Sequence, residues 1–154
     1  MTSQAAGLLM CRQGKDELEY FLVHPGGPYF QKKNEGWWSI PKGLPEENEK
    51  DMLVVACREF MEESGLVPSP PYHALGSVKE KGGKTVHAWA FIGNWSPADG
   101  IRSNAFEIEW PPKSGRLQKF PEADRAGWFN MEQATIMIKD TQLPFLHRAR
   151  EIFR

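Results

Sequence analysis

The chain has 154 residues, of which 40% are hydrophobic and 25% are charged, with a formal net charge of −1 at pH 7. This length suits a single domain, residues 1–154, with one sizeable core. The small net charge argues against a surface for polyanions, so we expect no stable nucleic-acid complex. No stretch approaches the roughly 20 apolar residues of a membrane span, and the first residues lack a signal-peptide pattern. We therefore expect a cytoplasmic protein without a membrane partner, with Cys11 and Cys57 as reduced core residues.

The first half of the chain predicts strands around a long loop. Residues 5–11 and 19–24 are short apolar or alternating runs on either side of a polar turn, which is typical of a strand pair. Residues 24–36 begin HPGGP, and the prolines and glycines exclude regular structure there. Residues 37–40 predict a short strand that leads into the glycine at position 43.

Residues 51–65 predict an amphipathic helix. Asp51 is a credible N-cap before the apolar run, and Gly65 is well placed to end the helix. Glu59, Glu62 and Glu63 are spaced i, i+3 and i+4, so their side chains converge on one arc. The opposite side of the helix carries the residues that we expect to be buried: Leu53, Ala56, Cys57, Phe60 and Ser64.

Three carboxylates on one arc need a compensating charge or water. At about 4 Å and an effective dielectric near 20, each like-charge pair costs roughly 4 kcal/mol. Oxygen ligands without a thiolate or imidazole favour Mg²⁺ or Mn²⁺ over zinc. The alternative is a solvated helix face on which Arg58 pairs with Glu62 one turn further on. A calcium-binding loop is excluded, because its alternating Asp-rich ligand pattern and central glycine are missing.

Residues 43–66 resemble the Nudix box, G-x5-E-x7-R-E-U-x-E-E-x-G-U, in which U is a bulky apolar residue. In this chain eight residues, not seven, separate the first glutamate from the arginine, so that counting back from the helix puts Lys50 in the glutamate position. We expect the loop to absorb the extra residue and Glu49 to keep the role. The matching residues are Gly43, Glu49, Arg58, Glu59, Phe60, Glu62, Glu63, Gly65 and Leu66.

This resemblance implies an α/β fold, a Nudix-type α/β/α sandwich with a mixed central sheet. It implies a MutT-like or dinucleoside polyphosphate hydrolase-like enzyme that uses Mg²⁺, with Mn²⁺ as the alternative. The implied metal ligands are Glu59, Glu62, Glu63 and the backbone carbonyl of Gly43, and Arg58 would orient Glu49. Bound Mg²⁺ neutralises phosphate oxygens and lowers the pKa of a bound water.

The general base and the substrate contacts are less closely defined by the box. The base is either a box glutamate or Glu122, because residues 121–128 resemble a late loop of dinucleoside polyphosphate hydrolases; the alternative for Glu122 is an exposed loop acid. Lys42, between a proline and a glycine, also resembles that branch and would contact phosphate as a point charge. Four aromatic residues lie between positions 29 and 38, and Tyr29 and Trp38 are the candidates for stacking on a base. Core packing is the alternative for at least two of the four.

The second half of the chain predicts more strands and then two helices. Residues 113–124 are polar and we expect them to be irregular. The expected strands are 72–80, 85–92, 106–110 and 127–130, and the expected helices are 131–139 and 142–153.

We predict hydrolysis of a phosphoanhydride bond in a nucleoside diphosphate linked to another group X. The segments HPGGP, SIPKG, HAWAF, RSNAFEIEWPP and FPEADRAGWF are similar to a bacterial subgroup described as predicted nucleoside-triphosphate pyrophosphohydrolases. The expected partner is a small-molecule nucleotide, first a dinucleoside polyphosphate and second a nucleoside triphosphate. The competing hypothesis is a non-catalytic nucleotide-binding regulatory module with the same fold, and the sequence leaves the oligomeric state open.

Overall fold

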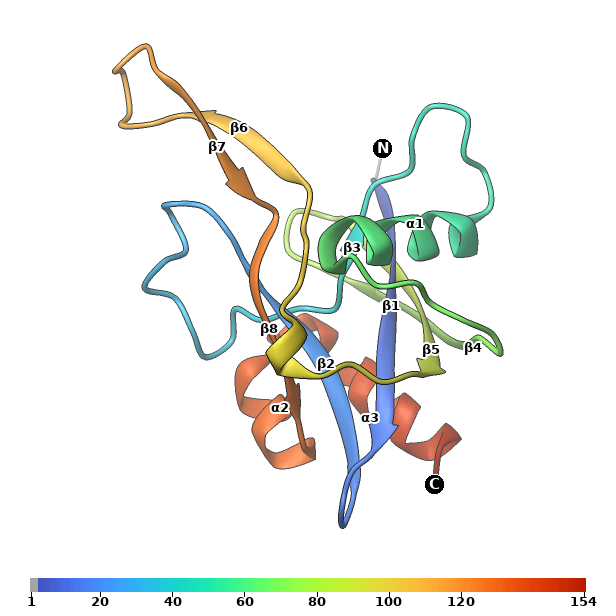
Figure 1. Ribbon diagram of the computed structural model, residues 1–154. Coiled ribbons are helices and arrows are strands. Elements are labelled where there is room, and N and C mark those ends of the chain that lie inside the picture. Colours follow the sequence, from blue (N-terminus) through green and yellow to red (C-terminus); the bar gives the residue numbers. More distant parts are fainter. Residues whose placement is uncertain (1–2) are drawn as a thin grey trace.

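A computed structural model describes residues 3–154 (Figure 1). Strands dominate the chain up to residue 129, and helices form its end. No helix in this described part is long and apolar enough to cross a membrane. In chain order the elements are β1 (Gln4–Gln13), β2 (Leu18–Pro25), β3 (Lys42–Gly43), α1 (Met52–Ser64), β4 (His73–Lys79), β5 (Thr85–Ile92), η1 (Pro97–Asp99), β6 (Ala105–Glu109), β7 (Leu117–Pro121), β8 (Ala123–Phe129), α2 (Met131–Met137), η2 (Asp140–Gln142) and α3 (Leu143–Ile152).

The main sheet is mixed and is built around β1. Its order is β4-β5-β1-β2-β8, and β1 runs parallel to β5 while the other pairs are antiparallel. On its other edge β1 pairs with β2 only at residues 11–13 and with β3 at residues 6 and 7. Strands β1 and β2 therefore diverge, and residues 39–43 lie between them, where Ser39 bridges to Val23 and β3 pairs with β1.

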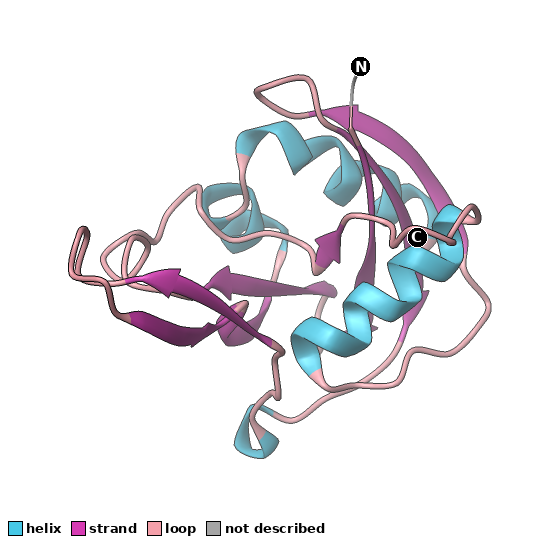
Figure 2. Ribbon diagram, turned by 90° about the horizontal axis from the view of Figure 1, so that it is seen from above, coloured by secondary structure: helices cyan, strands magenta, loops and turns pink. Residues whose placement is uncertain are grey.

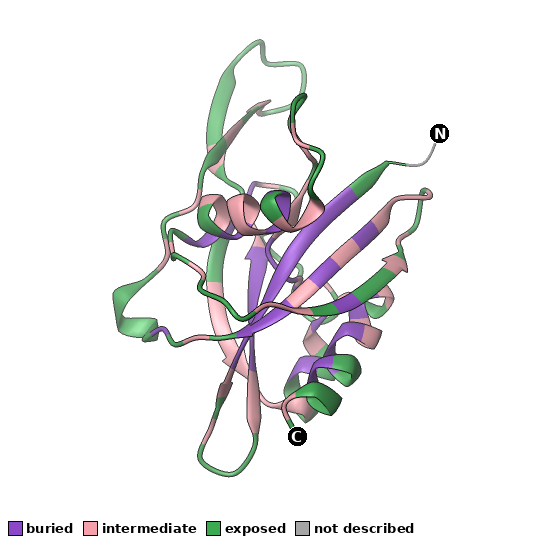
Figure 3. Ribbon diagram, turned by 90° about the vertical axis from the view of Figure 1, so that its right-hand side faces the viewer, coloured by how far each residue is buried: buried purple, intermediate pink, exposed green. Residues whose placement is uncertain are grey.

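Two apolar clusters cover the two faces of this sheet. Side chains of β1 alternate between them, with Leu9 in the cluster beneath α2 and α3 and Leu8 in the cluster beneath α1. Figure 2 shows helices on both sides of the strands, and Figure 3 shows buried residues along β1. The structure confirms the predicted α/β/α sandwich with a mixed sheet.

Helix α1 forms as its sequence predicts. The Asp51 side chain accepts a hydrogen bond from the Leu53 N–H at 3.0 Å, and Gly65 ends the helix with a φ of 79°. Such a positive φ is strained for residues with a side chain. Leu53 and Cys57 are only half-buried, although both pack against the α1-side cluster. The buried residues of the helix are Val55, Ala56, Phe60 and Ser64.

Two expectations about local structure are wrong. Residues 37–40 make isolated bridges to two different partners, Val23 and Ile138, so no continuous ladder forms, and the strand begins later, at Lys42. The expectation that residues 113–124 are irregular holds for 113–116 but is wrong for Leu117–Pro121, which form β7 and pair with β6 in a two-stranded sheet that projects from the body (Figure 1). Here pairing with a neighbouring strand overrides the polar composition.

Candidate active site

Arg58, in the middle of α1, gathers several carboxylates of the acidic segment. Its Nε and Nη2 donate to the two carboxylate oxygens of Glu49 at 2.8 and 2.7 Å. Its Nη1 donates to Glu59 and Glu62 at 2.9 and 2.8 Å. The hydrogen bonds from Arg58 hold the pKa of Glu49 down to about 2. A planar guanidinium with two parallel bonds fixes the orientation of a carboxylate as well as its position.

The extra residue between Glu49 and Arg58 is accommodated in the loop before α1. The Glu49 N–H donates to the Glu46 carbonyl at 3.0 Å, and the Glu46 N–H donates to Glu49 Oε1 at 2.9 Å. The next residue, Lys50, is exposed. The contact with Arg58 is therefore made by Glu49 and not by Lys50, and the part of Glu49 in catalysis stays a prediction.

Gly43 and Glu63 connect the acidic helix with the chain that precedes it. A Cβ at Gly43 would overlap the carboxylate of Glu59, so a side chain here would displace that carboxylate from its present position. Next to it, the Lys42 N–H donates to Glu63 Oε2 at 3.2 Å. Burial, and then the nearby charge of Glu59, hold the pKa of Glu63 well above its ordinary range. The backbone at residues 42–43 thus lies directly against two of the predicted metal ligands.

The late loop brings Glu122 to the same place. Its N–H donates to the Asn104 carbonyl at 2.7 Å, and the Asn104 N–H donates to the Glu62 carbonyl in α1 at 2.7 Å. Partial desolvation at the rim of the site, and then the charge of Glu62, raise the pKa of Glu122. Glu122 and Glu63 line one cavity of about 140 Å³ together with Lys42. A residue predicted from a late segment therefore shares a cavity with the Nudix-like helix.

The predicted metal ligands are three carboxylates of α1 and the backbone carbonyl of Gly43. Within residues 3–154, no three His, Cys, Asp or Glu side chains are already arranged as a metal cluster. The carboxylates do not meet at one point as helical spacing predicts, because Arg58 holds Glu59 and Glu62 while Glu63 accepts from the backbone of Lys42. The group still fits a hard cation, since these are oxygen donors and burial raises the pKa of both Glu59 and Glu63. A bound cation would offset that unfavourable burial.

Of the two aromatic residues predicted to contact a base, Trp38 is buried and Tyr29 is exposed. Trp38 is only 6% exposed, its indole N–H donates to Asn34 Oδ1 at 2.9 Å, and its ring packs edge-on against Phe129. This burial favours the core-packing alternative for Trp38, and its stacking on a base stays a prediction. Tyr29 is 55% exposed and packs edge-on against Trp110 of the β6–β7 hairpin, whereas half-buried Trp37 lines the cavity.

A buried amide that the sequence did not mark supports Lys42. Gln142 is fully buried; its Oε1 accepts from the Ile40 N–H at 3.1 Å and its Nε2 donates to Glu80 Oε2 at 2.9 Å. Burial acts to raise the pKa of Glu80, but hydrogen bonding by Gln142 and the charge of Lys42 lower it overall. Glu80 Oε1 lies 3.4 Å from Lys42 Nζ. No local pattern predicts this chain of contacts, since it joins three distant segments.

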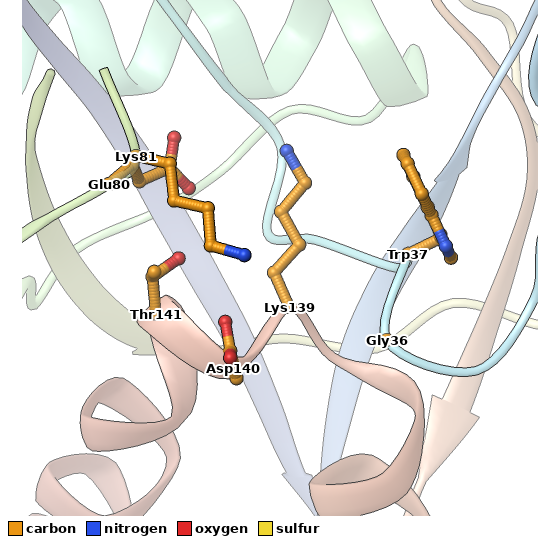
Figure 4. A pocket seen from close by; sticks show the side chains of 7 residues that line it. All are labelled: Gly36, Trp37, Glu80, Lys81, Lys139, Asp140 and Thr141. Carbon is orange, nitrogen blue, oxygen red and sulfur yellow. The ribbon is translucent and has the colours of Figure 1, made fainter.

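A second cavity adjoins the first. It measures about 250 Å³ and is lined by Gly36, Glu80, Lys81, Asp140 and Thr141, and it shares Trp37 and Lys139 with the smaller cavity (Figure 4). Lys139 follows the end of α2, and no motif around it predicts its position at these cavities.

Comparison with protein families identifies the family to which this chain belongs. The sequence pattern of the NUDIX domain matches residues 1–149. The chain belongs to the Nudix family. Nudix hydrolases generally use divalent metal ions, and the match over residues 1–149 places this chain in that family. This confirms the resemblance drawn from the nine motif residues.

Individual relatives show how far the similarity extends. This Nudix chain is 31% identical over 113 residues to the mRNA-decapping protein g5R of African swine fever virus, a match that covers 69% of this chain and 42% of that protein. The chain thus spans about two fifths of the length of this curated relative.

Solved structures show the shared fold. The NUDIX domain of Shewanella oneidensis NrtR, solved with ADP ribose, has a TM-score of 0.68 at 15% identity and covers 100% of this chain and 90% of its own. A C. elegans Ap4A hydrolase binary complex gives 0.65 at 21% identity, covering 99% and 98%. The MutT protein from Methanosarcina mazei Go1 gives 0.60 at 17% identity, covering 99% and 96%.

Proposed function

We propose that this Nudix hydrolase is a Mg²⁺-dependent pyrophosphohydrolase of nucleoside polyphosphates, with dinucleoside polyphosphates as the first substrate class and nucleoside triphosphates as the second. The observation that supports this is the cavity in which Glu63 and Glu122 lie beside Lys42. Carboxylates that suit a hard cation adjoin an ammonium group that suits a phosphate, which is what hydrolysis of a diphosphate requires.

Each residue has a part in this reaction. When bound, Mg²⁺ would neutralise charge on the phosphate oxygens and lower the pKa of a bound water. Glu59, Glu62, Glu63 and the Gly43 carbonyl would hold it, with Mn²⁺ as the alternative ion. Arg58 positions Glu49 and the α1 carboxylates, through the contacts described above.

Substrate binding and proton transfer fall to the residues around the metal ligands. Lys42 binds a phosphate as a point charge, held in place by Glu80. Glu122, whose pKa is raised, accepts the proton from the attacking water.

A third candidate substrate is the 5′ cap of mRNA. The 31% identity to a viral mRNA-decapping protein favours it. A cap is chemically a dinucleoside polyphosphate with an RNA attached, so the same carboxylates and lysine would serve. Because the match covers only 42% of that protein, the cap ranks after the two substrate classes named above.

The test is product release from a panel of dinucleoside polyphosphates, nucleoside triphosphates, nucleotide sugars and capped RNA, with and without Mg²⁺. We expect Mg²⁺-dependent cleavage, fastest with a dinucleoside polyphosphate. If nucleotides bind but nothing is cleaved with Mg²⁺ or Mn²⁺, the non-catalytic nucleotide-binding module replaces this proposal.

A further inference from the structure

Lys139 lies where the two cavities meet, and it is the feature that the proposed reaction leaves unused. It lines both the 140 Å³ cavity with Glu63 and Glu122 and the 250 Å³ cavity beside it. Among the ion pairs of residues 3–154, Lys42 has Glu80 as a partner, whereas Lys139 has none. Figure 4 shows its side chain extending between Trp37 and Glu80.

Hydrogen bonds fix the backbone around Lys139. Its position is therefore better defined than that of a lysine on a free surface loop. The Lys139 N–H donates to the Trp38 carbonyl at 2.8 Å, and the Trp38 N–H donates to the Met137 carbonyl at 3.0 Å. The end of α2 therefore pairs with the segment that carries Trp37. Lysine and tryptophan are held on one wall of the cleft by chain segments about a hundred residues apart.

Lys139 shares its surroundings with a second lysine. Burial, and then the charge of Lys42, lower the pKa of Lys139 overall, although the charges of Glu80 and Glu63 act to raise it. Glu80, the carboxylate that could compensate both lysines, already accepts from Gln142 and faces Lys42. Two ammonium groups in one partly buried place repel each other, and a phosphate between them would relieve the repulsion.

The size of the space also suits more than a diphosphate. Ligand pockets commonly measure about 300–1,000 Å³. Neither the 140 Å³ nor the 250 Å³ cavity reaches that range alone. The two share Trp37 and Lys139 as lining residues, and together their volumes fall within it. Trp37 supplies an aromatic surface of the kind on which nucleobases stack.

We propose that Lys139 and Trp37 form a subsite for the distal arm of the substrate, in which Lys139 binds a phosphate beyond the cleaved diphosphate and Trp37 packs against the second nucleoside. The subsite selects nucleoside polyphosphates that carry a second nucleoside over short diphosphates. It rests on the proposed function for the position of the cleaved bond. Lys139 is thus a specificity residue and not a catalytic one.

The experiment is calorimetric binding in Mg²⁺ of two non-hydrolysable probes, the methylene-bridged analogues of diadenosine tetraphosphate and of ADP. Lys139→Gln removes the charge and keeps most of the length. We expect it to weaken binding of the long probe by roughly 10- to 100-fold, the size of one charge-assisted phosphate contact, and of the short probe by less than about threefold. Trp37→Leu should weaken binding of the long probe but leave the affinity for inorganic tripolyphosphate unchanged.

Controls separate this subsite from loss of structure. Lys139→Arg retains the charge and should retain most of the affinity, and Lys119→Gln removes a charge from the exposed hairpin and should change nothing. The melting temperature of each variant establishes that it is folded.

The outcomes distinguish the subsite from the proposed function. Equal effects of Lys139→Gln on both probes, or none, overturn the subsite, as does a wild-type protein that does not prefer the long probe. If the long probe depends on Lys139 but no diphosphate is cleaved by the wild type, the subsite stands and the proposed function fails.

Discussion

The two walls of the cleft are held in different ways. On the α1 side, one arginine gathers carboxylates that lie within ten residues of it, and Arg58 reaches Glu49, Glu59 and Glu62 directly. On the opposite side, a fully buried amide, Gln142, joins the segment before α1 to the end of β4. The first wall is half-buried and charged, and the second is anchored in the core. Substitutions in the first wall should therefore change the effect of metal ions on the protein. Substitutions in the second wall should change its folding stability.

The largest effect is expected from Glu62→Gln. This change removes the charge of a predicted metal ligand and keeps the shape of the side chain. Because charge stabilisation of the transition state is lost, turnover should fall by roughly 100- to 1,000-fold. Steady-state kinetics in Mg²⁺ measure it. Glu107→Gln, on the exposed face of β6, is the matched control. Unchanged activity, with an unchanged melting temperature, would remove Glu62 from the metal site.

Arg58→Met tests whether the charged wall depends on its arginine. Glu49, Glu59 and Glu62 would lose their shared donor, and misplacement of a catalytic group by about 1 Å costs roughly 100-fold in rate. Without a metal ion the melting temperature should also fall, because the carboxylates repel each other. Added Mg²⁺ should restore part of that loss. A variant equally stable with and without Mg²⁺ would contradict metal binding at this wall.

Gln142→Leu tests the opposite wall. The Ile40 N–H and one oxygen of Glu80 would lose their buried partner, at about 1–3 kcal/mol for each unsatisfied group. We expect a lower free energy of unfolding in urea and a higher KM, because Lys42 loses its oriented partner, while kcat changes little. Gln31→Leu on the exposed loop is the control. A fall in kcat without any loss of stability would show that Gln142 acts on the chemistry instead.

The smallest effect concerns the thiols, one on each side of the sheet. Burial raises the pKa of Cys11 and, less strongly, that of Cys57. Thiolate is the reactive form, so both should react slowly with a thiol reagent in the native protein. Cys57 is half-buried and should react before Cys11, which is fully buried. Mass spectrometry after timed labelling measures the order, and faster labelling of Cys11 would mean that the sheet opens on the α3 side.

The sequence by itself determined the acidic wall, because its residues are neighbours along one helix. Periodicity and the caps predicted α1 from Asp51 to Gly65, and spacing placed its carboxylates on one arc. The strand pair at the start followed from alternation, and the sandwich followed from the Nudix resemblance. The roles of these carboxylates and of Glu122 in catalysis remain predictions.

Tertiary structure alone decided the other wall. Adjacent tryptophans at positions 37 and 38 look alike in sequence, but bridges on either side turn Trp38 into the core and leave Trp37 at the cavity. Lys139 is brought there by the backbone pairing of α2 with the segment before α1. β7 forms because β6 is its partner. Such contacts join residues far apart in the chain, and local propensity and spacing carry no information about them.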